Sequence, residues 1–340
     1  MNPLRPLGLG ELIDRAVNFW RVHWKPLFWL LLGFQLVEGT LVAASQGLTR
    51  VLFPLAGDAT ALKDPSPEVL AQLGGKTGML LFAILGALFI SQVAGVAVSH
   101  YSYARLINKG APNPSDSFRV AAARLGTTTG AFILSMAWSV VVMVLLMLPS
   151  GLLAGGAIAL GLNGQQGLAT VLGIFAVIAL ILGSIVLVLW FAIRFILVSQ
   201  IIAVEPLGAF ATFRRADALS SGRVYAGAAG IVKLRLTVLV TIVGTILLII
   251  GFVASIPTFI AGAIYGAGFQ PGNTLEDVVP IYVLAPLQLF QSVLGALLAP
   301  LYTVFQTFFY TDMRVRREGL DLELALTPPV VNPLAPLAPI

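Results

Sequence analysis

Residues 129–190 read TGAFILSMAWSVVVMVLLMLPSGLLAGGAIALGLNGQQGLATVLGIFAVIALILGSIVLVLW and contain no charged side chain. The charge-free interval extends from Arg124 to Arg194. It is long enough for two helices, because about 20 apolar residues cross a hydrocarbon core of about 30 Å. The polar turn Asn-Gly-Gln-Gln at 163–166 divides it. We therefore predict two membrane spans, at 129–148 and 168–190.

Four further apolar stretches of the 340-residue chain have a similar length. They predict spans at 27–44, 77–99, 236–255 and 282–308, which brings the total to six. The chain is 58% hydrophobic and only 10% charged, with a mean hydropathy of +0.95. Soluble domains carry about 45–50% apolar and about 25% charged residues. The sequence therefore argues against a soluble globular enzyme and predicts an all-α integral membrane protein.

Two apolar pieces that follow prolines are too short to span a membrane. They are 151–160 after Pro149 and 258–268 after Pro257. Proline lacks a backbone donor and often ends a helix. We expect both pieces to be interfacial or re-entrant segments.

The distribution of Lys and Arg predicts the orientation. With six spans, 17 of the 20 cationic residues fall on one side of the membrane, and only Arg50, Lys63 and Lys76 fall on the other. Cytoplasmic loops carry the excess of positive charge. Both termini are therefore expected in the cytoplasm, with residues 1–326 as one membrane domain and 327–340 as a Pro-rich cytoplasmic tail.

Short amphipathic helices are predicted before three of the spans. Residues 9–24 place apolar side chains at helical spacing, as an interfacial elbow helix does. A second helix is expected at 116–125, capped by Ser115 or Asp116, and a third at 207–219. The unit of surface helix, span and span thus recurs, which predicts a threefold pseudo-repeat.

Glu38 is the acidic residue inside a predicted span, where a charge needs a partner or water. One interpretation is a proton or cation relay in a polar cavity; the other is a wetted carboxylate near the outer end of the span, paired with Arg50. Intramembrane glutamines can complete such a cavity or simply hydrogen-bond between helices. The candidate intramembrane polar site comprises Glu38, Gln35, Gln92, Gln288 and Gln291.

Arginines of the cytoplasmic face form a second candidate site, for anionic lipid or a protein partner. Its members are Arg15, Arg21, Arg214, Arg215, Arg314, Arg316 and Arg317. The i,i+4 spacing predicts the pairs Asp312–Arg316, Arg314–Glu318 and Arg317–Asp321. Glu205 is expected to pair with a cytoplasmic arginine. These charges either order the cytoplasmic face or dock a partner.

Residues for catalysis are scarce. The chain has no Cys and two isolated His, and no phosphate-binding glycine loop stands in a suitable context. We expect no catalytic residues, no metal and no cofactor. Nucleic acid is not an expected partner, because the basic residues are spread over membrane-proximal loops.

Three stretches resemble one protein family. They are residues 5–15 (RPLGLGELIDR), 204–222 (VEPLGAFATFRRADALSSG) and 310–323 (YTDMRVRREGLDLE). These resemble the opening, central and closing motifs of the bacterial glycerophosphoryl diester phosphodiesterase membrane domain family, although Ala216 and Asp217 depart from its central motif. The resemblance implies a stand-alone bacterial membrane domain without the catalytic phosphodiesterase domain, and implies no activity.

Together these features predict a non-catalytic, multi-pass protein of the bacterial inner membrane. Its leading expected role is to organise anionic lipid or a partner protein through the basic cytoplasmic face. The alternative is a transporter or channel for a small or lipid-derived solute, because Glu38 and the interrupted helices resemble features of repeat-built transporters.

Overall fold

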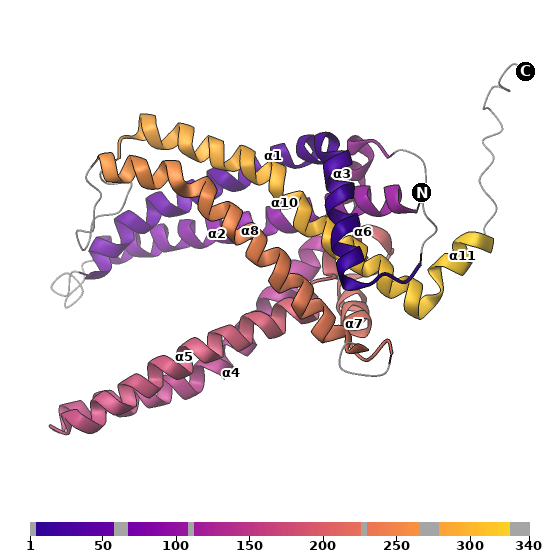
Figure 1. Ribbon diagram of the computed structural model, residues 1–340. Coiled ribbons are helices and arrows are strands. Elements are labelled where there is room, and N and C mark those ends of the chain that lie inside the picture. Colours follow the sequence, from indigo (N-terminus) through magenta and orange to yellow (C-terminus); the bar gives the residue numbers. More distant parts are fainter. Residues whose placement is uncertain (1–4, 58–66, 108–111, 226–229, 266–278, 327–340) are drawn as a thin grey trace, which may run out of the picture.

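The computed structural model describes residues 5–57, 67–107, 112–225, 230–265 and 279–326 (Figure 1). These residues form helices and their connections, with one isolated β-bridge between Arg223 and Ile231. Within the described ranges, six helices are long and apolar enough to cross a membrane, so the predicted all-α membrane class is confirmed. They are α1 (Leu9–Gly57), α2 (Pro67–Leu106), α4 (Leu125–Leu162), α5 (Gln166–Phe195), α8 (Val232–Ile264) and α10 (Ile281–Glu318). The predicted tail, 327–340, lies outside the described residues.

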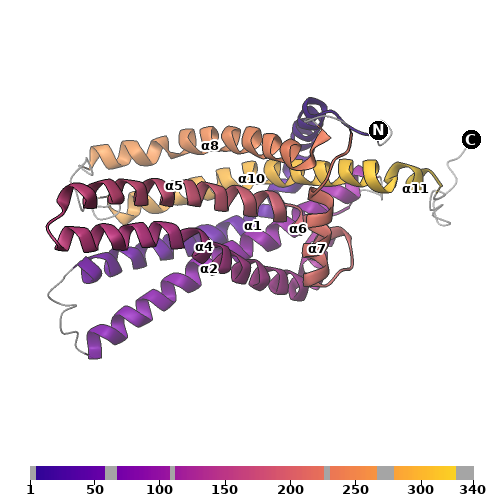
Figure 2. The ribbon, with the colours of Figure 1, turned by 90° about the horizontal axis from the view of Figure 1, so that it is seen from below.

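The long helices occur in pairs that meet at one end of the molecule. Figures 1 and 2 show the pairs α1–α2, α4–α5 and α8–α10 running away from a common region, which we call the basal end. The short helices α3 (Pro114–Ala123), α6 (Val198–Val204), α7 (Ala209–Ser220) and α11 (Leu320–Leu326) lie there. The basal end is therefore where distant parts of the sequence come together.

The predicted surface helices are present. Helix α1 has non-helical backbone angles at His23 (φ −111°, ψ 19°), and the part before this kink lies across the basal end (Figure 1). Helices α3 and α7 precede α4 and α8, so the order of surface helix and two long helices occurs three times. A pseudo-threefold axis relating the units stays a prediction.

The predicted cap of the second surface helix is wrong. Its N-cap residue is Asn113, not Ser115 or Asp116, and Pro114 occupies the first turn. Proline favours that position because its fixed φ suits a helix and the amide it lacks would be unpaired there. The helix therefore begins earlier than the polar residues alone suggested.

The two pieces expected to be separate segments instead continue the preceding helices. Helix α4 passes through Pro149 to Leu162, and α8 passes through Pro257 to Ile264. The hydroxyl of Ser150 donates to the Met147 carbonyl at 2.9 Å, and that of Ser255 to the Gly251 carbonyl at 2.9 Å. The carbonyls that the prolines leave without an i+4 amide are those of Leu145 and Val253, so these serine bonds do not replace the lost ones.

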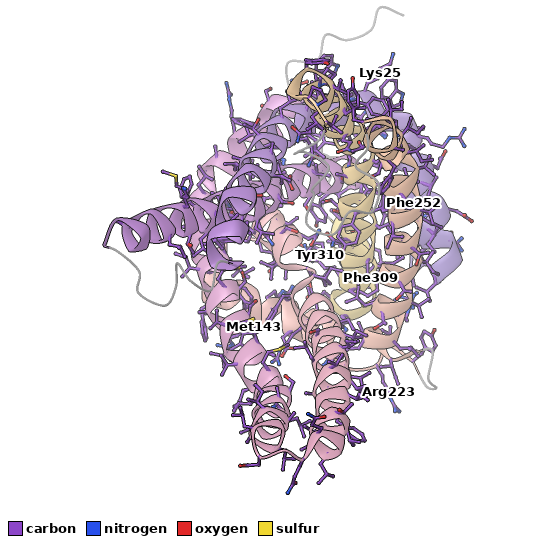
Figure 3. All side chains as sticks on the ribbon, turned by 90° about the vertical axis from the view of Figure 1, so that its left-hand side faces the viewer. Lys25, Met143, Arg223, Phe252, Phe309 and Tyr310 are labelled. Atoms are coloured by element: carbon purple, nitrogen blue, oxygen red, sulfur yellow. The ribbon has the colours of Figure 1, made fainter. Side chains whose placement is uncertain are left out.

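The apolar core is concentrated at the basal end. Buried side chains from α1, α6, α8 and α10 meet there, among them Leu12, Ile201, Leu236 and Phe309. Figure 3 places Phe309 and Tyr310 within the molecule, whereas Met143 and Phe252 lie on its outer sides. Phe252 is 63% exposed. Exposed apolar side chains along the long helices suit contact with lipid.

Candidate functional site

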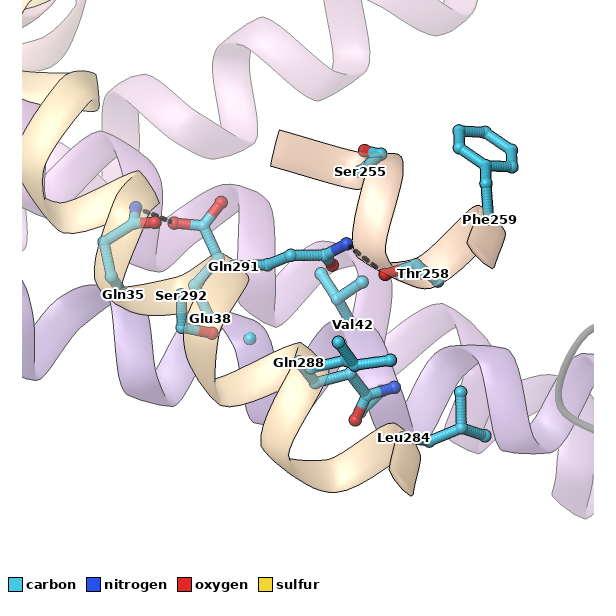
Figure 4. Close-up of a pocket in the computed structure, with 13 residues that line it drawn as sticks. Gln35, Glu38, Val42, Ser255, Thr258, Phe259, Leu284, Gln288, Gln291 and Ser292 are labelled. Carbon is cyan, nitrogen blue, oxygen red and sulfur yellow. Dashed lines mark hydrogen bonds between the residues drawn. The ribbon is translucent and has the colours of Figure 1, made fainter. Parts of the chain in front are cut away.

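A polar cavity lies between α1, α8 and α10, with a volume of about 450 Å³ (Figure 4). It brings together four of the five residues predicted for the intramembrane site: Gln35, Glu38, Gln288 and Gln291. Ser255, Thr258 and Ser292 add hydroxyl groups to its lining.

Glu38 is half-buried on the wall of this cavity. The Gln35 side-chain amide donates to its carboxylate at 2.9 Å, and the Gln291 amide donates to the Thr258 hydroxyl oxygen at 2.9 Å (Figure 4). None of the described residues that line the cavity carries a positive charge. The lining therefore offers one carboxylate with amide and hydroxyl groups, an environment suited to a cation or a hydrogen-bond donor.

Close packing of α1 against α10 forms one side of the cavity. A Cβ atom added at Gly39 would collide with the Ser292 hydroxyl, and one added at Gly295 would collide with the Gln35 amide oxygen. Glycine at these positions lets the two helices approach closely and keeps the polar side chains of both helices in contact. The side chain of Arg50, the alternative partner of Glu38, lies outside the described residues.

Gln92 is not part of this site, which corrects the grouping drawn from sequence. It lines a second cavity of about 370 Å³ between α2, α4, α6, α7 and α10. Intramembrane polarity identified the residue, but spacing along one chain does not tell which helices face each other. Thr258 was not among the predicted site residues, although its position directly after Pro257 in an apolar helix was an available signal.

The arginines predicted for the cytoplasmic face are largely engaged in contacts within the chain. Buried Asp312 accepts hydrogen bonds from the Leu7 amide at 2.7 Å and from Arg316 at 2.9 and 3.0 Å, as the predicted i,i+4 pair requires. Arg235 of α8 lies 3.7 Å from the same carboxylate, and both side chains are at most 3% exposed. Arg235 and Arg316 also donate to the Leu7 carbonyl at 3.0 and 2.7 Å.

A second group of charges centres on Glu205. As expected, this carboxylate pairs with an arginine, Arg215, at 3.1 Å, and it accepts a hydrogen bond from the Tyr310 hydroxyl at 2.7 Å. Arg215 also pairs with Glu318, which accepts from Arg314 at 3.0 Å in the predicted i,i+4 pair. Burial lowers the pKa of Arg215, but Glu205 and Glu318 more than offset this, so its pKa lies above the ordinary value. We call both groups together the basal ion cluster: Leu7, Glu205, Arg215, Arg235, Tyr310, Asp312, Arg314, Arg316 and Glu318.

The remaining arginines of this predicted group divide into paired and exposed ones. Arg15 pairs with Glu11 at 2.8 Å. Arg317 donates to the carbonyls of Ala218 and Ser221, so the predicted Arg317–Asp321 pair is wrong.

The Arg317–Asp321 pair does not form because Gly319 lies between the two residues. It ends α10 with a left-handed backbone (φ 65°) and interrupts the i,i+4 geometry.

Arg21 and Arg214 are exposed and form no ion pair with a described residue.

The arrangement thus combines an acidic cavity among the long helices with a mostly self-paired basal surface. Within the described ranges, no group of three or more His, Asp or Glu side chains could hold a metal ion. No family model, curated protein or solved structure matches the chain. The geometry of the two regions is therefore the basis for assigning a function.

Removal of Asp312 tests the basal ion cluster. The D312A variant leaves Arg235 as a buried charge without its carboxylate, and breaking a buried pair in this way costs about 3–5 kcal/mol. We expect a large fall in melting temperature and in the yield of monodisperse protein in mild detergent. The control is D14A, since Asp14 is exposed on α1. Equal melting of the two variants would contradict the assignment.

Proposed function

We propose that this chain is a membrane transport protein that binds a small cationic solute at Glu38. The observation that carries the proposal is the Glu38 carboxylate on the wall of a cavity of about 450 Å³, in which none of the described lining residues is cationic. An ionisable residue at membrane depth usually marks an ion, proton or substrate pathway. The negative charge favours a cation, and the surrounding amides and hydroxyls can replace part of its hydration.

The helices around the cavity support this proposal. Pro257 interrupts the hydrogen bonds of α8 beside Thr258, and Pro286 lies in α10 one turn before Gln291. Transporter sites are commonly formed where spanning helices are interrupted and can rearrange. The cavity lies on the two helices that carry these prolines.

The orientation and the family are proposals of the same standing. We place the chain in a bacterial inner membrane with the basal end in the cytoplasm, because this end carries most of the cationic residues. We also propose membership of the glycerophosphoryl diester phosphodiesterase membrane domain family, without catalytic activity. In support, its three motif stretches meet in the basal ion cluster, where Leu7 contacts Asp312 and Glu205 contacts Tyr310.

Organisation of anionic lipid by the cytoplasmic face is a second candidate function. Its support is Arg21 on the surface part of α1 and Arg214 on α7, both exposed, with the half-exposed Trp24 beside Arg21. Cations near an anionic leaflet each contribute about 1 kcal/mol. The other candidate arginines contribute less to binding anionic lipid, because carboxylates or carbonyls of the chain already accept their hydrogen bonds.

The first prediction concerns Glu38. In proteoliposomes, uptake of Na⁺, K⁺, ammonium or methylammonium should fall at least tenfold in E38Q, because the variant keeps the shape and removes the charge. The matched control is Q92L, a polar residue of another span outside this cavity, and it should transport like the parent. Parent-like uptake by E38Q, or uptake of none of these cations by the parent protein, would refute a cation site.

The second prediction concerns topology. A reporter enzyme that is active only in the cytoplasm should be active when it is fused after Glu323, because α11 lies at the basal end, which we place in the cytoplasm. A fusion in the connection between α4 and α5, after Gly164, should report the opposite side. Activity of the Glu323 fusion outside the cell would overturn the orientation.

The third prediction concerns lipid. The double variant R21E/R214E should retain less phosphatidylglycerol than the parent in native mass spectra, by about 1 kcal/mol for each lost cation. The charge-reversal control is K76E, because Lys76 lies in the part of α2 that is far from the basal end. This variant should retain as much phosphatidylglycerol as the parent. Equal retention in all three proteins would exclude this role for the two arginines.

A further inference from the structure

The second cavity contains polar groups that have no hydrogen-bond partner among the described residues. Ser91 and Gln92 are exposed on α2, line this cavity, and form no hydrogen bond with a described residue. Both lie in the predicted span 77–99, where water is scarce. An amide or hydroxyl without a partner in an apolar medium costs several kcal/mol. A polar group of a bound molecule would remove this cost.

The lining of the cavity specifies the charge of that group. None of the described residues that line it is charged; the polar ones are glutamines, hydroxyl residues and one tyrosine, Tyr302. A charged headgroup would find no counter-ion there and would be costly to bury. Gln306 is already engaged, since it accepts a hydrogen bond from buried Gln200 at 2.9 Å. Gln92 and Ser91 are thus left to bind an uncharged group with both donors and acceptors.

The walls of the cavity are apolar and are formed by elements that diverge from each other. Leu88 of α2, Phe132 and Met136 of α4, and Phe213 of the surface helix α7 line it. Beyond the basal end, the α4–α5 pair runs apart from the other long helices (Figures 1 and 3), and Ile133 and Val140 on α4 are more than half exposed. The cavity thus runs from α7 to parts of α2 and α4 that are predicted to lie within the membrane.

We propose that this cavity binds one uncharged glycerolipid of the diacylglycerol type. Its free hydroxyl and ester carbonyls would hydrogen-bond to Gln92 and Ser91, and its acyl chains would lie along α2 and α4. A volume of about 370 Å³ suits the glycerol and ester region, because sites for small molecules usually start at about 300 Å³. This site is separate from the Glu38 cavity, so it stands or falls independently of cation transport.

A photoactivatable diacylglycerol analogue tests the proposal on the full chain in mild detergent. Labelling should fall at least fivefold in Q92L, which removes the polar partner, and in S135F, which fills the cavity from α4. The matched control Q288L, in the other cavity, should be labelled like the parent. Each variant is compared only if it elutes as a single species by size exclusion. If neither Q92L nor S135F elutes as a single species, a competition experiment on the parent protein replaces them. Unlabelled diacylglycerol should then suppress labelling of the parent protein by the analogue, and unsuppressed labelling would contradict the proposal.

Three results would overturn the proposal. The first is equal labelling of the parent and Q92L. The second is labelling by a phosphatidate analogue that equals or exceeds labelling by diacylglycerol, which would indicate a charged lipid. The third is capture of a second copy of the chain by a photo-crosslinking residue placed at Met136, which would show that the cavity is covered by protein.

Discussion

Charge is costly in hydrocarbon, and this cost organises the molecule. At the basal end, Asp312 and Glu205 hold the N-terminal segment, α7, α8 and α10 together through arginine partners. A buried pair contributes little to stability compared with apolar groups of the same shape, but removal of one partner is severe. The cluster thus specifies how these segments meet. Glu38 departs from this arrangement, because it keeps a carboxylate midway along α1 with an amide as its partner.

Two cavities lie between long helices that share the basal core. The Glu38 cavity lies between α8 and the closely packed helices α1 and α10. The Gln92 cavity lies between α2 and α4 and is also lined by residues of α5, α6, α7 and α10. Helix α10 borders both. In a membrane, lipid rather than water surrounds such spaces, so polar side chains in them require a specific partner.

Sequence reasoning succeeded where the physical signal is local. Intervals without charge identified five of the six long helices, and apolar length identified the sixth, whose predicted span at 27–44 contains Glu38. Gln35 and Glu38 were assigned to one site, and their side chains do form a hydrogen bond. It failed where the outcome depends on which helices are neighbours, as for Gln92 and for the Arg235–Asp312 contact. The prediction that the helices end at Pro149 and Pro257 failed for another reason. Pro149 removes a single backbone hydrogen bond, and a continuous apolar helix in a membrane can absorb that loss.

The position of the prolines in α10 separates a fixed part of this helix from an adjustable one. Beyond Pro300 the helix carries Tyr310 and Asp312, whose hydrogen bonds to distant segments fix its orientation. Before Pro300, and around Pro286, the backbone lacks hydrogen bonds that would oppose bending. Gln291 lies in that part and lines the same cavity as Glu38. A helix held rigidly at one end and weakened near the cavity can therefore change the shape of the cavity without disturbing the basal ion cluster.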